Sequence, residues 1–185
     1  MSRIEPLSPP YPPDVGARLD AMMPGDVPPI ALFRTFVHNM PMTEAMAGWG
    51  GYVLGKNLSL TLRDRELLID RTTARCGCEY EWGVHIAFFA DAADLTPSQV
   101  RSLTHGSADD DCWSDRDALL LRLADAVHDT ADVDDALWAR LADEFTEQEL
   151  LDALFVCGWY HAISYVATAA RVDLEPGAPR FADVA

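Results

Sequence analysis

The chain has 185 residues, of which 49% are hydrophobic and 24% charged, so it is long enough for one domain with a substantial core. Its formal net charge of -16 at pH 7 argues against nucleic acid and acidic membrane surfaces as partners, because phosphate groups are bound by clustered Lys and Arg. The N-terminal residues contain no apolar stretch of the kind found in secretory signals, so we expect a soluble, cytoplasmic protein with no membrane partner.

Proline sets the N-terminal region apart from the rest of the chain. Prolines recur throughout residues 1–29, which we predict to form an extended N-terminal arm. Residues 30–172 are predicted to form a single all-α domain, because no window shows the alternation typical of strands. Residues 173–185 include Pro176 and Pro179 and are predicted to be an irregular tail.

Apolar periodicity and boundary residues predict eight helices in chain order. They cover residues 30–40, 42–55, 62–75, 79–94, 97–105, 114–128, 134–143 and 147–171. The Cys-Gly-Cys sequence at 76–78 separates the third helix from the fourth, since glycine is unfavourable inside a helix. Capping boxes that begin at Thr96 and Thr146 mark the start of the fifth and the last helix.

The last helix contains an apolar segment at residues 153–170 that carries no formal charge and is just long enough to span a bilayer. Gly158, His161, Ser164 and Thr168 interrupt this segment, and no basic residues mark a cytoplasmic end. We therefore expect a helix buried in a bundle, since a helix that is apolar on all sides is typically a core helix.

Four residues that can move protons or electrons fall close together in an apolar part of the sequence. Cys78, Glu81 and His85 are spaced i, i+3 and i+7, so they share one face of the predicted helix, and Glu66 lies in the preceding helix. Buried groups of these types are costly unless they are paired. We predict a catalytic cluster of these four residues, although each one also has an ordinary structural interpretation in the core or on a solvated helix face.

The other candidate residues are aromatic or sulfur-containing. Trp82, Trp159 and His161 are predicted to line a substrate pocket, although aromatic residues in such runs are more often core. If Cys78 begins a helix, its thiol pKa should fall and its reactivity should rise. The four cysteines include no pair of CxxC motifs, so we expect no structural zinc site. Glu66, Glu81 and His85 lack the further His or carboxylate at i+3 or i+4 that metal sites between paired helices usually have, so we expect no metal there, and we expect no cofactor.

Residues 62–69 (LRDRELLI) followed by residues 78–85 (CEYEWGVH) resemble the carboxymuconolactone decarboxylase and alkyl hydroperoxidase D superfamily. The resemblance implies an all-α helical bundle that assembles as a homo-oligomer, a trimer, hexamer or dimer, with a site at the paired helices. It also implies that Glu66 and His85 form a proton relay and that Cys78 matches the first cysteine of a CxxC dithiol. The second cysteine is replaced by Glu81, so the resemblance is closer to the decarboxylase-like branch.

Three functions follow from these residues and the resemblance. The first is a decarboxylase-like lyase that performs cofactor-free acid–base chemistry on a small carboxylic acid or lactone through His85 and Glu66. The second is a thiol peroxidase with peroxiredoxin-type activity at Cys78, in which Cys76 would have to supply the second thiol. The third is a non-enzymatic oligomeric binding protein that keeps the same scaffold.

Overall fold

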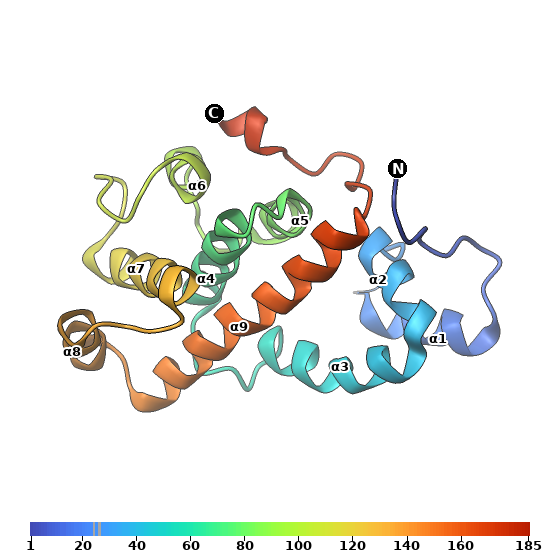
Figure 1. The fold of residues 1–185 in the computed structure, drawn as a ribbon, viewed down its shortest axis with the longest axis horizontal. Coiled ribbons are helices and arrows are strands. Elements are labelled where there is room, and N and C mark those ends of the chain that lie inside the picture. The colour runs from blue at the N-terminus through green and yellow to red at the C-terminus, as the bar shows by residue number, and fades with distance from the viewer. Residues whose placement is uncertain (24, 26) are drawn as a thin grey trace.

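The computed structural model describes residues 1–23, 25 and 27–185, and this part of the chain is helical without any strand. Within these residues nine α-helices follow one another (Figure 1). They are α1 (Pro13–Met22), α2 (Ala31–Phe36), α3 (Met40–Val53), α4 (Leu62–Arg75), α5 (Glu79–Phe89), α6 (Pro97–His105), α7 (Asp115–Thr130), α8 (Asp135–Glu144) and α9 (Glu147–Ala170). Two short 3-10 helices, η1 (Val37–Asn39) and η2 (Phe181–Val184), complete the described elements.

Helices α4 and α9 form the centre of the packing. Helix α4 contacts α5, α6, α7 and α9, and α9 runs diagonally across the molecule (Figure 1). Leu67, Leu68 and Ile69 of α4 are completely buried in the main hydrophobic core. Helices α6, α7 and α8 lie at one end of the molecule, and α1, α2 and α3 lie at the other. The fold thus presents α4 and α5 side by side, with α9 packed against both.

Side-chain caps explain where several helices begin. The Thr61 hydroxyl accepts a hydrogen bond from the backbone N–H of Asp64, whose side chain accepts one from the Thr61 backbone, which is a capping box. The predicted capping boxes at Thr96 and Thr146 are also present, with Gln99 and Glu149 as the reciprocal partners. Each such cap stabilises its helix by about 1 kcal/mol. Helices α4, α6 and α9 therefore start within a residue of the predicted positions.

Several predicted elements differ from the structure. The helix predicted at residues 30–40 ends at Phe36 and is followed by η1, and the tail predicted to be irregular contains η2. The proline-rich arm is not extended throughout, because residues 13–22 form α1. Val15 and Leu19 of α1 pack against Val37 in a small hydrophobic cluster. This packing explains why residues 13–22 are helical. The helix that begins at Glu79 ends at Phe89 and not near position 94, and Asp94 adopts a positive φ in the turn that follows.

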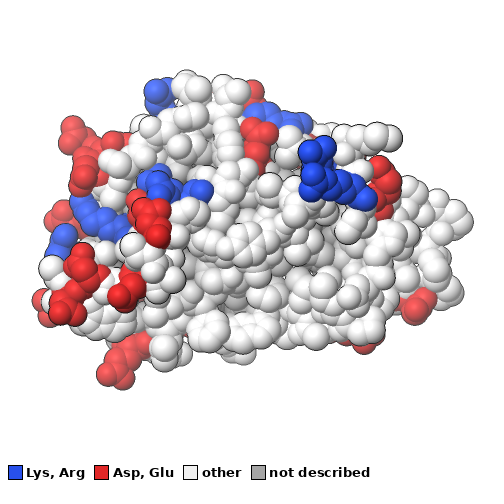
Figure 2. Space-filling view, in the orientation of Figure 1, with Lys and Arg blue, Asp and Glu red and all other residues white. Residues whose placement is uncertain are grey.

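Helix α9 is long and apolar enough to cross a membrane by length and composition, but half of its apolar window is buried inside the protein. This burial agrees with the prediction of a core helix. Helix α9 also carries the exposed side chains of Leu151, Phe155 and Tyr165, and the ring of Phe155 stacks on that of Trp49 of α3. Figure 2 shows few charged residues over this face, whereas acidic side chains gather at the end formed by α6, α7 and α8.

Candidate active site

Glu66 and His85 meet across the contact between α4 and α5. The Oε2 atom of Glu66 lies 2.8 Å from Nδ1 of His85, and both side chains are buried. The other carboxylate oxygen, Oε1, accepts hydrogen bonds from Arg65, at 2.7 Å from Nε and 2.6 Å from Nη2. Charge-assisted bonds of this kind favour the ionised carboxylate. Glu66 is therefore an anion that accepts a hydrogen bond from Nδ1–H of His85.

The second ring nitrogen of His85 faces two other ionisable groups. Its Nε2 atom lies 3.0 Å from the hydroxyl of Tyr160 on α9 and 3.7 Å from Oε2 of Glu81. Because Nδ1 donates to Glu66, the hydrogen-bond network assigns the lone pair of the neutral imidazole to Nε2. The Tyr160 hydroxyl then donates to Nε2. This arrangement leaves Nε2 as the basic atom of the cluster.

Burial sets the protonation of the neighbouring carboxyl groups. Burial raises the pKa of Glu81, while the nearby His85 lowers it, and the net shift is upward. One turn after Glu66, burial and the charge of Glu66 hold the pKa of Asp70 well above its usual range. The pKa of Tyr160 is likewise raised, mainly by burial and then by Glu81. The raised pKa of Glu81 favours its protonated form, which can donate a proton, whereas Tyr160 keeps its proton and acts as a hydrogen-bond donor.

A largely apolar cavity of about 350 Å³ opens beside these residues. Helices α1, α2, α3, α5 and α9 contribute side chains to its wall. Glu81, His85 and Tyr160 line it, together with apolar residues such as Phe36, Met46 and Trp159. A cavity of this size and character suits a small organic molecule with a few polar groups. A molecule bound in this cavity would therefore lie beside His85, on the side of the ring that carries the basic Nε2 atom.

Arg18 of α1 is a cation on the wall of the same cavity. Its Nη2 atom donates to the backbone oxygen of Thr43 at 3.2 Å, while its buried Nε has no hydrogen-bond partner within the described part of the chain. A buried donor without a partner is costly, and a bound carboxylate would satisfy it. Sequence reasoning missed Arg18 because the arm was expected to be extended and remote from the site.

Cys78 does not have the environment of a reactive thiol. It is the N-cap residue of α5, as the sequence suggested, but it is 1% exposed and packs in a hydrophobic cluster with Tyr80 and Ile163. Burial raises its thiol pKa, so the predicted lowering by the helix N-terminus is wrong. Hydrogen bonds to the sulfur oppose the effect of burial but do not overcome it. Cys78 is also not among the residues that line the cavity.

The three residues predicted to bind substrate lie in three different places. Trp159 lines the cavity. Trp82 is completely buried in the main core, where its ring lies 5.1 Å from that of Phe181, and it does not reach the cavity wall. His161 lies on another face of α9, against His128 of α7.

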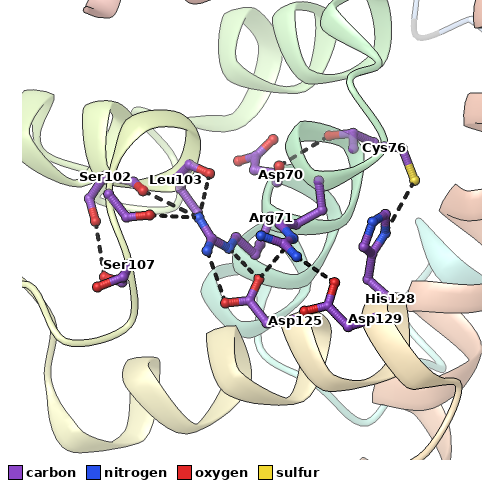
Figure 3. Close-up of polar contacts among 12 residues, drawn as sticks. Asp70, Arg71, Cys76, Ser102, Leu103, Ser107, Asp125, His128 and Asp129 are labelled. Carbon is purple, nitrogen blue, oxygen red and sulfur yellow. Dashed lines mark hydrogen bonds and ion pairs between the residues drawn. The ribbon is translucent and has the colours of Figure 1, made fainter.

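Three arginines of α4 that could offer a positive charge to a substrate are paired with carboxylates of α7 instead. Arg63 makes two hydrogen bonds to Asp117, and Arg71 makes two to Asp125 (Figure 3). Arg75 binds Asp129. These arginines pair with carboxylates of α7 because of long-range packing, which the spacing of residues along the sequence does not reveal.

Solved structures share this fold at low sequence identity. The debrominase Bmp8 matches with a TM-score of 0.80 and 15% identity, over 98% of this chain and 97% of that chain. An uncharacterized peroxidase-related protein from a Silicibacter species matches with a TM-score of 0.79 and 16% identity, over 98% and 96%. An alkylhydroperoxidase AhpD core protein from Ralstonia eutropha, also described as peroxidase-related, matches with a TM-score of 0.79 and 18% identity, over 93% of both chains.

No protein-family model matches the sequence, and no curated protein matches it. The structural likeness nevertheless defines the architecture. The chain has the AhpD-like helical fold that the sequence resemblance implied. At these identities the likeness concerns the fold, and the chemistry has to be argued from the residues of this chain.

Proposed function

We propose that this protein is a carboxymuconolactone decarboxylase-like enzyme that performs cofactor-free acid–base chemistry on a small, largely apolar carboxylic acid or lactone. One observation carries the proposal: the proton-transfer groups Glu81 and His85 line the cavity together with Tyr160, whereas the thiol of Cys78 is buried away from it. Cavities with a few convergent polar groups of perturbed pKa are the usual setting of such chemistry.

His85 is the proposed base, because its Nε2 atom has the lone pair and Glu66 stabilises the imidazolium that forms when a proton is taken up. With substrate bound, the Tyr160 hydroxyl would transfer its hydrogen bond from Nε2 to the substrate, and a proton next to a carbonyl group of the substrate would move to Nε2. Glu81, whose pKa is raised by burial, would donate its proton to the carbonyl oxygen on which negative charge develops. A positioned acid or base of this kind accelerates a reaction by about 10²–10⁴-fold.

Arg18 supports an anionic substrate in an otherwise acidic protein. Its guanidinium would bind a carboxylate in the cavity, and its charge would offset the repulsion that a net charge of -16 imposes on an anion. The substrate class is therefore an apolar body with a carboxylate or lactone oxygen near one end.

The alternative is a thiol peroxidase that uses Cys78. The fold likeness to peroxidase-related proteins favours it. The burial of Cys78, its raised pKa and the carboxylate of Glu81 in place of a second thiol disfavour it, because a dithiol cycle needs a reactive thiolate and a resolving thiol. Acid–base chemistry requires neither.

Deuterium incorporation tests the proposal with simple compounds of the proposed substrate class. Small carboxylic acids and lactones are incubated with the protein in D₂O, and exchange at the carbon next to the carbonyl is followed by NMR. We expect exchange with the wild type and with Cys78→Ser, and none with His85→Ala. Loss of exchange in Cys78→Ser would contradict the proposal. Peroxide consumption that depends on Cys78 would support the thiol peroxidase, and absence of both activities would support a binding protein.

We also propose that the chain self-associates through the uncharged face of α3 and α9. Phe155 is 54% exposed and Tyr165 is 66% exposed, and the ring of Trp49 stacks on that of Phe155 at 5.1 Å. Contiguous exposed apolar side chains of this kind mark interaction surfaces. A second copy of the same chain is the partner we expect, as the family resemblance implies.

A further inference from the structure

Three metal-binding side chains converge at a position separate from the active site. Among the described residues, Cys76, His128 and His161 place their ligand atoms within 4.8 Å of one another. Cys76 follows the last turn of α4, His128 lies in the last turn of α7, and His161 lies in the middle of α9. Figure 3 shows the Cys76 sulfur pointing at the His128 ring. We propose that these three residues bind a zinc ion that joins α4, α7 and α9.

The distances are close to those of a tetrahedral zinc site. Nδ1 of His128 lies 2.9 Å from Nε2 of His161 and 3.9 Å from Sγ of Cys76. Ordinary zinc–nitrogen and zinc–sulfur bond lengths place two nitrogens about 3.4 Å apart, and a nitrogen and a sulfur about 3.6 Å apart. These two pairs are thus within about half an ångström of the required separations. The third pair, Cys76 and His161, has its ligand atoms within 4.8 Å of each other.

The hydrogen bonding of His161 orients it as a metal ligand. Its Nδ1 lies 3.0 Å from the backbone oxygen of Cys157, to which Nδ1–H donates. This bond leaves the lone pair on Nε2, which points toward His128 and the site. Ligating histidines in proteins are held in this way, with the second ring nitrogen bound to a carbonyl or carboxylate. The hydrogen bond to Cys157, on the side of the His161 ring away from the proposed ion, therefore already fixes the orientation of this ring.

Ion pairs hold the helix that carries His128. Arg71 binds Asp125 through two hydrogen bonds, at 2.7 and 2.9 Å, and Arg75 binds Asp129 (Figure 3). These pairs fix the end of α7 against α4 on both sides of His128. All three ligand residues are half-buried, so an ion can enter from solvent.

The donor set favours zinc and leaves one position open. One thiolate and two imidazoles suit zinc, which takes four ligands in a tetrahedral arrangement. Three protein ligands leave the fourth position to water or a small anion. Cys76 and Glu66 are ten residues apart on and just after α4, about 15 Å along the helix axis, so the ion would not contact His85.

Metal titration of the purified, reduced and chelator-treated protein tests this proposal. Zinc is titrated in competition with a coloured chelator, and Co²⁺ serves as a spectroscopic probe because a thiolate ligand gives a charge-transfer band. We expect one Zn²⁺ per chain and a cobalt spectrum with this band and tetrahedral intensity. Zinc should also raise the Tm of the wild type.

Matched variants identify the ligands. We expect Cys76→Ser, His128→Gln and His161→Gln each to weaken zinc binding at least about 100-fold, since even the loss of a supporting contact costs 10–100-fold. Cys112→Ser and His105→Gln replace a half-buried cysteine and a helix-end histidine elsewhere and should bind as the wild type does. Circular dichroism checks that each variant is folded, and His128→Gln, at the end of α7, is the mildest change.

Two results would overturn the proposal. The first is a wild-type protein that binds no zinc under these conditions. The second is zinc or cobalt binding that survives unchanged in folded Cys76→Ser and His128→Gln. Activity is not part of the readout, so the result is independent of the reaction proposed for His85.

Discussion

Replacement of Glu66 by glutamine tests both the energetics and the chemistry of the buried cluster. Glu66 is completely buried, and its carboxylate is the ionic partner of Arg65, which is 7% exposed. Glutamine has nearly the same shape but no charge, so the Arg65 guanidinium would remain buried without a counter-ion. Breaking a buried ion pair in this way costs about 3–5 kcal/mol. In a protein of this size the Tm should fall by about 6–20 °C.

The same substitution should disable the proposed base. The amide of glutamine can donate to Nδ1 of His85, which would move the ring hydrogen to Nε2 and remove its lone pair from the cavity. We therefore expect the deuterium exchange rate to fall by about 10²–10⁴-fold. Thermal unfolding followed by circular dichroism measures the first effect, and the NMR exchange assay measures the second.

Two companion variants separate charge from shape. Asp70→Asn alters another buried carboxyl on α4 whose pKa is already raised, so it removes little charge at neutral pH and should change the unfolding free energy by less than about 1 kcal/mol. Arg65→Met combined with Glu66→Gln removes the stranded cation and should recover most of the lost Tm without recovering exchange. A Glu66→Gln protein with unchanged Tm and unchanged exchange would refute the reasoning.

The remaining predictions concern the cavity, the thiol and the surface. Arg18→Met should raise the KM for a carboxylic acid by about 10-fold or more and leave the KM for a neutral lactone unchanged, as steady-state kinetics with the two substrates would show. In the folded protein Cys78 should react with a thiol reagent far more slowly than an exposed cysteine does, and the rates should converge in denaturant. The raised pKa of Glu81 means that ionisation of this carboxyl destabilises the folded state. Glu81→Gln should therefore raise the Tm at pH 8, and the gain should vanish as the pH falls to about 3, below the pKa of about 4.3 that a glutamate has in the unfolded chain. Phe155→Asp should shift the elution of the protein on size-exclusion chromatography to a smaller species, whereas Trp138→Asp, at another exposed aromatic residue on α8, should not.

The helices were predictable because their signals are local. Thr96 and Thr146 each begin a capping box that both predicts and explains a helix start. The failure at α1 has a tertiary cause: Val15 and Leu19 gain burial against Val37, which the prolines on either side of this segment conceal in the sequence. Local propensity gives way to packing in such cases.

The candidate site was predictable only in part, because tertiary packing that the local sequence does not show also decides which residues reach it. The family resemblance paired Glu66 with His85, and in the structure Oε2 of Glu66 lies 2.8 Å from Nδ1 of His85. The contribution of Arg18 depends on how α1 folds back onto α3, which no local pattern reports. Burial at Cys78 reverses the expected direction of the thiol pKa because desolvation outweighs the effect of its position at a helix start.

The cluster of Cys76, His128 and His161 was beyond sequence reasoning. Cys76 and His128 are 52 residues apart, and His128 and His161 are 33 residues apart. Neither spacing matches a metal-binding motif. Only the packing of α4, α7 and α9 places them together.

The protonation of His85 tests the central claim most directly. The ¹⁵N and ¹H NMR signals of this ring, assigned by comparison with His85→Ala, report which nitrogen carries the hydrogen. At neutral pH we predict hydrogen on Nδ1 and none on Nε2 in the wild type, and the reverse in Glu66→Gln. A wild-type ring with its hydrogen on Nε2, or a ring unaffected by Glu66→Gln, would contradict the account.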